Sequence, residues 1–324
     1  MKEIPSELMS GPFTRRQARA AGVTDRMLQS KRFVRVHHGV WRLASYEMTG
    51  PDLVVAARLA LPDRARMTGL TRIQALGLDF GPSTPVRFVI EGDHHLALKG
   101  VFLHRTRKLA PGGAIAVSPA AAFLAFCAEA RAIDALKVGD WLLHHAHMTV
   151  EEVRELALAA LWRDGAHEAL FVLEDLDPRS KSLPESETRA VLTWAGLPRP
   201  EVNPVVHLDE SVSVELDLLY REQRMAVEYE GSQHQLDREQ YASDIDRYAL
   251  FRERNIAYVQ VTKEKLRSPR RLVAEVHRAL VTRGYAGSPP DFGERWAMLF
   301  ERVSSAVGSR KDRILAAYRE GVVS

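Results

Sequence analysis

Two neighbouring strand-like segments constrain the fold of this chain more than any other feature. They read SVSVELDLLY (residues 211–220) and RMAVEYEG (residues 224–231), and the polar link REQR joins them. Apolar and polar residues alternate in both segments, which is the period of a β-strand. Because the link is short and polar, the sequence predicts a hairpin. Helical patterns before and after it predict a domain with a mixed sheet between helices.

Acidic residues occupy matching positions in this hairpin. One face of the first strand is apolar and carries Val212, Val214, Leu216 and Leu218. Glu215 and Asp217 take the opposite face, and Glu228 and Glu230 share one face of the second strand. Pairing of the strands would therefore bring Asp217 towards Glu228 and Glu230.

Carboxylates that converge in this way repel one another unless a proton or a cation lies between them. Hard oxygen ligands favour Mg²⁺, or Mn²⁺ in its place. The alternative is a solvated strand face whose acids only increase solubility. Asp and Glu are depleted in strands, however, and the three acids expected to converge, Asp217, Glu228 and Glu230, all belong to two adjacent strands. The pattern therefore favours a metal site.

Two further acidic positions have ordinary structural explanations. Glu185 is three residues after Ser182, at the start of a predicted helix, where a capping box accounts for it. Asp244 and Arg247 are three residues apart on a later predicted helix, where a surface ion pair accounts for them. A catalytic role for any of the three depends on the surrounding fold.

The length of 324 residues predicts two or three domains. The tract EDLDPRSKSLP breaks a helical pattern with prolines and charges, so it predicts a boundary. We expect a helical unit with a hairpin at 1–46, an α+β middle domain at 47–178, a mixed α/β domain at 179–287 and a helical extension at 288–324.

The first 46 residues have the outline of a winged helix-turn-helix. TRRQARAAG opens with a Thr-x-x-Gln capping box and ends on glycine, and TDRMLQS predicts a second short helix. The basic segment KRFVRVHHGVWRLA then alternates around a glycine, as a two-stranded wing does.

The chain from about 182 to 284 resembles the DUF559 family, proteins related to very-short-patch mismatch repair endonucleases. The resemblance rests on an ordered series of motifs: Glu185 with Arg189 in ESETR, Asp217 in VELDLLY, the element Glu228-Tyr-Glu230-Gly-x-x-His234, and Asp244 with Arg247 in SDIDR. It implies a PD-(D/E)XK nuclease with the restriction-endonuclease-like α/β/α fold.

The resemblance implies roles for these residues in a Mg²⁺-dependent DNA endonuclease or nickase. Asp217, Glu228 and Glu185 would hold the metal ion, and Glu230 would be a further ligand or a neighbour of one. Glu230 stands where the superfamily often has a lysine, so His234 is the candidate general base. Arg247 would orient Asp244 or contact a phosphate. Asn255 replaces a glycine that the family commonly has before its next strand.

The N-terminal and middle segments resemble AbiEi-type antitoxins, through FTRRQARAAGVTDRMLQSKRFVRVHHGVWRLA and through LTRIQALGL, TPVRFVIEG and GVFLHRTRKLAP. DNA is the partner that this resemblance implies. The candidate DNA contacts are Thr24, Arg26 and Gln29 on the second helix and Arg32, Arg35 and Arg42 on the wing. The alternative function is therefore an antitoxin or transcriptional regulator with a toxin partner and a nuclease-like domain that does not cleave.

Composition limits the binding partners, disulfides and metal sites that the chain can have. The 45 Lys and Arg residues nearly balance 42 Asp and Glu residues, so an acidic partner must meet local basic patches. Cys127 is the one cysteine, which excludes an internal disulfide and favours a buried thiol. Adjacent histidines, as at 94–95 and 144–145, would point to opposite faces of a strand, and no third ligand has a settled position. A histidine metal site is therefore not favoured. We expect a cytoplasmic protein without a membrane segment.

Overall fold

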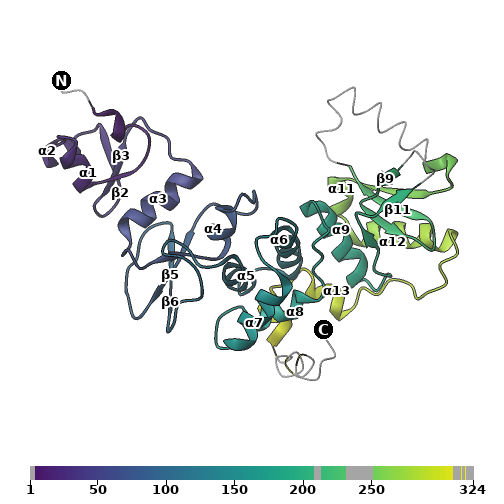
Figure 1. The fold of residues 1–324 in the computed structure, drawn as a ribbon. Helices are drawn as coiled ribbons and strands as arrows, with labels where there is room; N and C mark the ends of the chain where they lie inside the picture. Colours follow the sequence, from purple (N-terminus) through teal and green to yellow (C-terminus); the bar gives the residue numbers. More distant parts are fainter. Residues whose placement is uncertain (1–3, 208–212, 231–250, 309–314, 316–317, 319–324) are drawn as a thin grey trace. The chain divides into compact units, whose positions relative to one another are not determined.

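The chain folds into two compact units, Met1–Ala125 and Phe126–Ser324, and each contains helices and strands (Figure 1). A computed structural model describes residues 4–207, 213–230 and 251–308, together with Leu315 and Tyr318. The predicted site residues His234, Asp244 and Arg247 lie outside the described residues. Among the described residues, no helix has the length and apolar character that crossing a bilayer requires.

The first unit begins with two short helices against a three-stranded sheet. Its elements are η1 (Ser6–Leu8), β1 (Phe13–Thr14), α1 (Arg15–Ala20), α2 (Asp25–Leu28), β2 (Phe33–His37) and β3 (Val40–Leu43). Thr14 and Thr24 cap the two helices as predicted, and Thr14 forms the full capping box with Gln17. The hairpin turns at Gly39, and β1 pairs with its second strand β3, which is the central strand of the sheet. Phe13 and Phe33 meet edge to face in the core between these elements.

A second sheet completes this unit. Its elements are α3 (Gly50–Ala60), β4 (Arg66–Met67), α4 (Gly69–Gln74), β5 (Val86–Glu91) and β6 (Val101–Thr106). The strand order is β4-β5-β6, with β5 and β6 parallel, so β6 is an edge strand. One face of the sheet packs Phe88, Ile90 and Met67 around Ala57 of α3.

Helices form the first part of the second unit. Helix α5 (Pro119–Cys127) crosses the division between the units and leads into α6 (Ala132–His144), α7 (Val150–Ala159) and α8 (Ala166–Leu173). Cys127 is buried, and burial raises the pKa of its thiol well above the ordinary value. From the C-terminal side, α13 (Glu294–Met298) packs back on α9 (Leu183–Trp194), and α14 (Val303–Val307) packs back on α8.

A mixed four-stranded sheet forms the rest of this unit, in the order β12-β11-β10-β7. Its elements are α9 (Leu183–Trp194), β7 (Glu201–Val202), β10 (Leu218–Tyr220), β11 (Met225–Tyr229), β12 (Ala257–Val261), α11 (Lys263–Leu266) and α12 (Pro269–Thr282). The predicted hairpin is present, since β10 and β11 are antiparallel around residues 221–224. Helix α12 contacts β11 and β12 (Figure 1).

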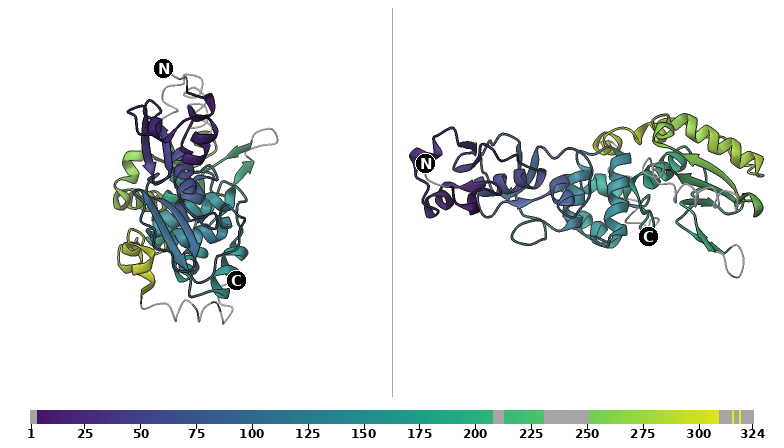
Figure 2. Two further views of the ribbon diagram at one scale, coloured as in Figure 1. Left: turned by 90° about the vertical axis from the view of Figure 1, so that its left-hand side faces the viewer. Right: turned by 90° about the horizontal axis from the view of Figure 1, so that it is seen from above.

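The segment SVSVELDLLY is not the single strand that its alternation predicts. It divides into β9 (Ser213–Glu215) and β10, and β9 pairs with β8 (Val205–His207) in a separate two-stranded ribbon. Figure 2 shows this ribbon projecting from the four-stranded sheet. Leu216 at the break is fully buried in a cluster with Leu219 and Ala226, so the chain turns there to reach the core.

The tract predicted as a domain boundary near residue 178 lies inside the second unit. Helix α6, before the tract, packs along α9, after it. The division that the contacts define is between Ala125 and Phe126. The prolines and charges of the tract therefore mark a connection between packed helices.

Candidate functional site

Asp217 and Glu228 hold each other at the break between β9 and β10. The backbone N–H of Asp217 donates to Glu228 Oε1 at 3.2 Å, and the N–H of Tyr229 donates to Asp217 Oδ2 at 2.7 Å. Leu218 pairs with Val227, so one step further along the register Asp217 is opposite Glu228. Each of the two side chains therefore reaches the backbone of the other's strand across the predicted hairpin.

The two acids differ in burial. Glu228 belongs to β11, where Met225, Ala226 and Val227 are also buried, and its side chain is only 5% exposed. Asp217 is half-buried and lies outside the regular strand. A buried carboxylate requires hydrogen bonds or a cation to remain charged. The pair thus combines a fixed inner acid with a more accessible outer one.

Glu185 is placed by the N-terminus of α9. Its N–H donates to Ser182 Oγ at 3.3 Å, as in the predicted capping box. Its carboxylate, however, accepts from the N–H of Lys181 at 3.0 Å and from Asn203 Nδ2 at 2.7 Å. In a full capping box this carboxylate would accept from the N–H of Ser182, but here it accepts from the preceding residue, Lys181. The carboxylate is also directed towards Asn203.

Asn203, which is not among the residues predicted from the sequence, connects Glu185 to Asp217. Its backbone N–H donates to the Asp217 carbonyl at 2.9 Å, while its side chain donates to Glu185 and to the Arg179 carbonyl. Its φ of 46° is left-handed, a conformation that asparagine tolerates better than most residues. The available signal was the turn dipeptide Asn-Pro directly after a strand.

Glu230 follows β11 and extends its pairing, because its N–H donates to the Val261 carbonyl at 2.8 Å. Among the described residues, no group of three or more His, Cys, Asp or Glu side chains is arranged to hold a metal ion. The part of the predicted site that the structure brings together is thus Asp217 with Glu228, connected to Glu185 through Asn203.

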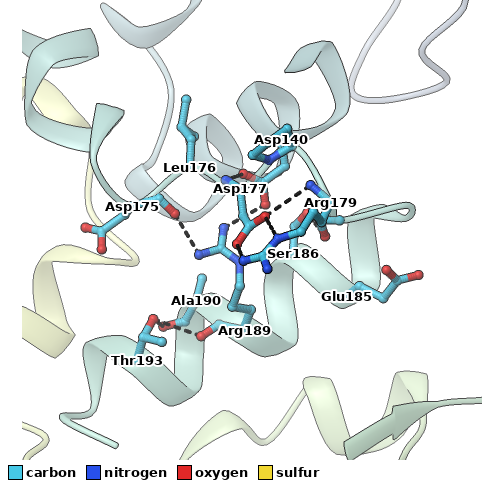
Figure 3. Close-up of polar contacts among 12 residues, drawn as sticks. Asp140, Asp175, Leu176, Asp177, Arg179, Glu185, Ser186, Arg189, Ala190 and Thr193 are labelled. Atoms are coloured by element: carbon cyan, nitrogen blue, oxygen red, sulfur yellow. Dashed lines mark hydrogen bonds and ion pairs between the residues drawn. The ribbon is translucent and has the colours of Figure 1, made fainter. Parts of the chain in front are cut away.

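Arg189, which the nuclease resemblance grouped with Glu185, has a different environment. Its guanidinium is 1% exposed and donates to Asp140 Oδ2 of α6 at 2.7 Å and to the Asp175 carbonyl at 2.6 Å. The same Asp140 accepts from the N–H of Asp177 at 2.7 Å. Figure 3 shows these groups converging while Glu185 points away. Arg189 therefore fixes α9 to α6, and Glu185 extends from the helix so fixed.

The environment of the neighbouring Asp177 should make the free energy of unfolding depend on pH. Burial alone raises the pKa of its carboxyl group, but hydrogen bonds from the Arg179 side chain and backbone lower the pKa below the ordinary value. Ionised Asp177 thus stabilises the fold above the unfolded-state pKa, and this stabilisation is lost as pH falls through the folded-state pKa. We expect Asp177→Asn to lower the unfolding free energy by about 1–2 kcal/mol at pH 7 and by less at pH 3. Urea unfolding at both pH values measures this, and an equal deficit at both contradicts it.

Asn255, directly before Ile256 and β12, adopts a left-handed backbone conformation. Its φ is 55°, the left-handed region that glycine favours and asparagine accepts. Arg283 of the segment after α12 donates to Asn255 Oδ1 at 2.8 Å and to its carbonyl at 2.6 Å. The side chain of Asn255 therefore gains a partner that glycine could not provide.

In the first unit, Asp25 joins the two short helices. It accepts from Arg15 and Arg19 of α1, and these guanidinium groups hold the pKa of its carboxyl far below its usual range. Asp25 stays ionised at neutral pH, so α1 and α2 remain bridged.

The predicted DNA contacts of this unit divide into two groups. Arg26, Gln29 and Arg35 are exposed, and Arg32 is half-buried. Arg42 instead donates to the carbonyls of Leu43, Ala44 and Tyr46, so its guanidinium is directed onto its own chain. Thr24 uses its hydroxyl to cap α2, accepting from the N–H of Met27.

Comparison with known proteins adds two relatives. The chain is 26% identical over 263 residues to "Uncharacterized protein MT2308" of Mycobacterium tuberculosis (strain CDC 1551 / Oshkosh) and to "Uncharacterized protein Rv2248" of Mycobacterium tuberculosis (strain ATCC 25618 / H37Rv). The match covers 78% of this chain and 94% of each relative. No family model and no solved structure matches the chain.

Proposed function

We propose that this protein is a Mg²⁺-dependent DNA endonuclease or nickase with its own DNA-binding module. The observation that carries the proposal is the interlocked pair of Asp217 and Glu228, held at the point where two adjacent strands meet. One oxygen of each carboxylate accepts a hydrogen bond from a backbone N–H. Backbone hydrogen bonds position both acids without cancelling their charge.

The donor set fits Mg²⁺. This ion takes hard oxygen ligands and is commonly held by one or two carboxylates together with substrate phosphates. Asp217 and Glu228 would hold it, and Glu185 would approach from α9 through its link to Asn203. Bound Mg²⁺ supplies an activated water and neutralises the charge that grows on the scissile phosphate.

The residues of the chain then divide the remaining tasks. Buried Glu228 would be the inner ligand, and half-buried Asp217 would be the ligand more accessible to a phosphodiester. Asn203 keeps Glu185 in register with Asp217. Glu230 is a further ligand or neighbour, and His234, Asp244 and Arg247 keep the roles that the family resemblance implies.

DNA binding is assigned to the first unit. Two short helices and a three-stranded sheet with a hairpin are the components of a winged helix-turn-helix. Arg26 is exposed on α2, Gln29 is exposed directly after it, and Arg35 is exposed on the wing. Exposed guanidinium groups bind phosphates without reading sequence, whereas residues of the second helix contact base edges.

A cleavage assay tests the proposal. We expect the full chain to cleave or nick supercoiled plasmid DNA with Mg²⁺ or Mn²⁺ and not with EDTA. Asp217→Asn should reduce the rate more than about 100-fold, because even indirect partners of metal ligands are worth 10- to 100-fold.

Glu215→Gln provides the matched control. Glu215 is two residues from Asp217 but pairs with Lys181 at the surface, so this variant should cleave at the wild-type rate. Absence of metal-dependent cleavage on plasmid, duplex and mismatched DNA, or an undiminished rate in Asp217→Asn, would refute the nuclease.

One observation favours the alternative of an antitoxin-like regulator. The Glu185 carboxylate already accepts two N–H donors, as a structural carboxylate does. Metal-independent, sequence-specific binding to upstream DNA, retained in Asp217→Asn, would support that function.

A further inference from the structure

The edge strand β6 carries an exposed aromatic ring in basic surroundings. Phe102 is 45% exposed, and the Arg87 guanidinium on the adjacent strand lies 5.4 Å from its ring centroid. The two residues pair directly in the parallel register of β5 and β6, so both side chains leave the sheet on the same face. This arrangement is fixed by the sheet and does not depend on a loop.

An open concavity of about 560 Å³ runs along this strand. It is lined by Gly92, Asp93 and the six residues from Phe102 to Arg107. Its volume is within the range of ligand sites, roughly 300–1,000 Å³. Phe102 is the one phenyl ring of its lining, at one end of the strand, and Arg105 and Arg107 are at the other.

The local charge is positive. Between residues 86 and 108 the chain has five Lys or Arg residues and two acids, and Asp93 is paired with Arg105 and His95. Arg107 is exposed at the end of the strand. A phenyl ring offers a carboxylate neither a hydrogen-bond donor nor a positive charge, so it adds nothing to the binding of acidic side chains. Aromatic and guanidinium planes, in contrast, both stack on nucleobases.

We propose that Phe102 and Arg87 form a stacking platform for single-stranded nucleic acid, with the exposed Arg107 at the other end of the concavity contacting its phosphates. The platform is distinct from the proposed winged helix, which is suited to duplex DNA. It goes beyond the proposed nuclease and does not depend on it, because binding requires neither the second unit's carboxylates nor a metal ion.

Fluorescence anisotropy of the full chain in EDTA tests the platform. The probes are a labelled 15-nucleotide oligo-dT strand and an abasic strand of equal length, which has the same phosphates without bases. We expect Phe102→Ala to weaken dT binding by roughly 5- to 150-fold, the range for losing one stacked base, and to leave abasic binding unchanged. Phe102→Tyr keeps the ring and should bind dT within about twofold of wild type.

Trp162 provides a matched control elsewhere in the chain. It is 50% exposed and has Arg163 at 4.5 Å from its ring, but it does not line the concavity. Trp162→Ala should bind dT as wild type does.

Three results would overturn the platform: unchanged dT affinity in Phe102→Ala, an equal loss for the abasic strand, or Phe102-dependent binding of a poly-glutamate peptide in place of dT. The last would indicate that the edge strand binds an acidic peptide. Because no arm measures cleavage, an inactive nuclease does not affect the outcome.

Discussion

Replacing Arg189 with leucine is expected to lower the free energy of unfolding of the second unit by about 3–5 kcal/mol, the usual loss when one partner of a buried ion pair is removed. Asp140 is fully buried and would remain without its cation. The Asp175 carbonyl would also lose its donor. Urea unfolding followed by circular dichroism measures the change.

Two comparisons make this result specific. Arg221→Ala breaks an exposed ion pair with Glu201 in the same unit, and we expect a loss below about 1 kcal/mol. The double variant Asp140→Leu/Arg189→Leu removes both charges and should be more stable than Arg189→Leu alone. An Arg189→Leu protein within 1 kcal/mol of wild type would show that the buried pair does not fix α9.

Replacing Glu228 with glutamine is expected to separate catalysis from stability. The amide oxygen can still accept from the Asp217 N–H, so the unfolding free energy should change by less than about 1 kcal/mol. The negative charge is lost, so Mg²⁺-dependent cleavage should fall more than about 100-fold. Cleavage rates and Mg²⁺ affinity by calorimetry, measured beside urea unfolding, give both quantities.

Glu228→Leu distinguishes the two effects further. Leucine removes the charge and the acceptor together, which leaves the Asp217 N–H without this partner and costs about 1–3 kcal/mol. Both variants should be inactive, but only Glu228→Leu should be less stable. If Glu228→Gln keeps full activity, Glu228 serves the hairpin alone and the metal site must lie elsewhere.

The features that the sequence predicted well are those set by local chemistry. Thr14, Thr24 and Ser182 start helices because their side chains accept from N–H groups three residues ahead. The link REQR turns the chain back within four residues, and the register that it sets brings Asp217 opposite Glu228. Each of these depends on residues close together in the chain.

What could not be predicted depends on distant contacts. Alternation is the same in a continuous strand and in one that breaks at Leu216, and only the core that buries Leu216 decides between them. Arg189 is separated by 49 residues from Asp140, so their pairing leaves no local pattern. Asn203 acts through its backbone conformation and two donors, which its residue type alone does not indicate.

The position of the Arg189 pair has a consequence for how such a protein can be rearranged. A chimera joined near residue 178 would inherit the guanidinium from one parent and Asp140 from the other, and any foreign helix in place of α6 would have to offer a carboxylate at the same point. A join at residues 125/126 keeps the pair together. A join there falls inside helix α5, so both parents would have to supply a helix at this point. The part that recombination could exchange without separating the pair is therefore Phe126–Ser324, and the sheet that carries Asp217 and Glu228 would be inherited with the helices α6 and α9 that support it.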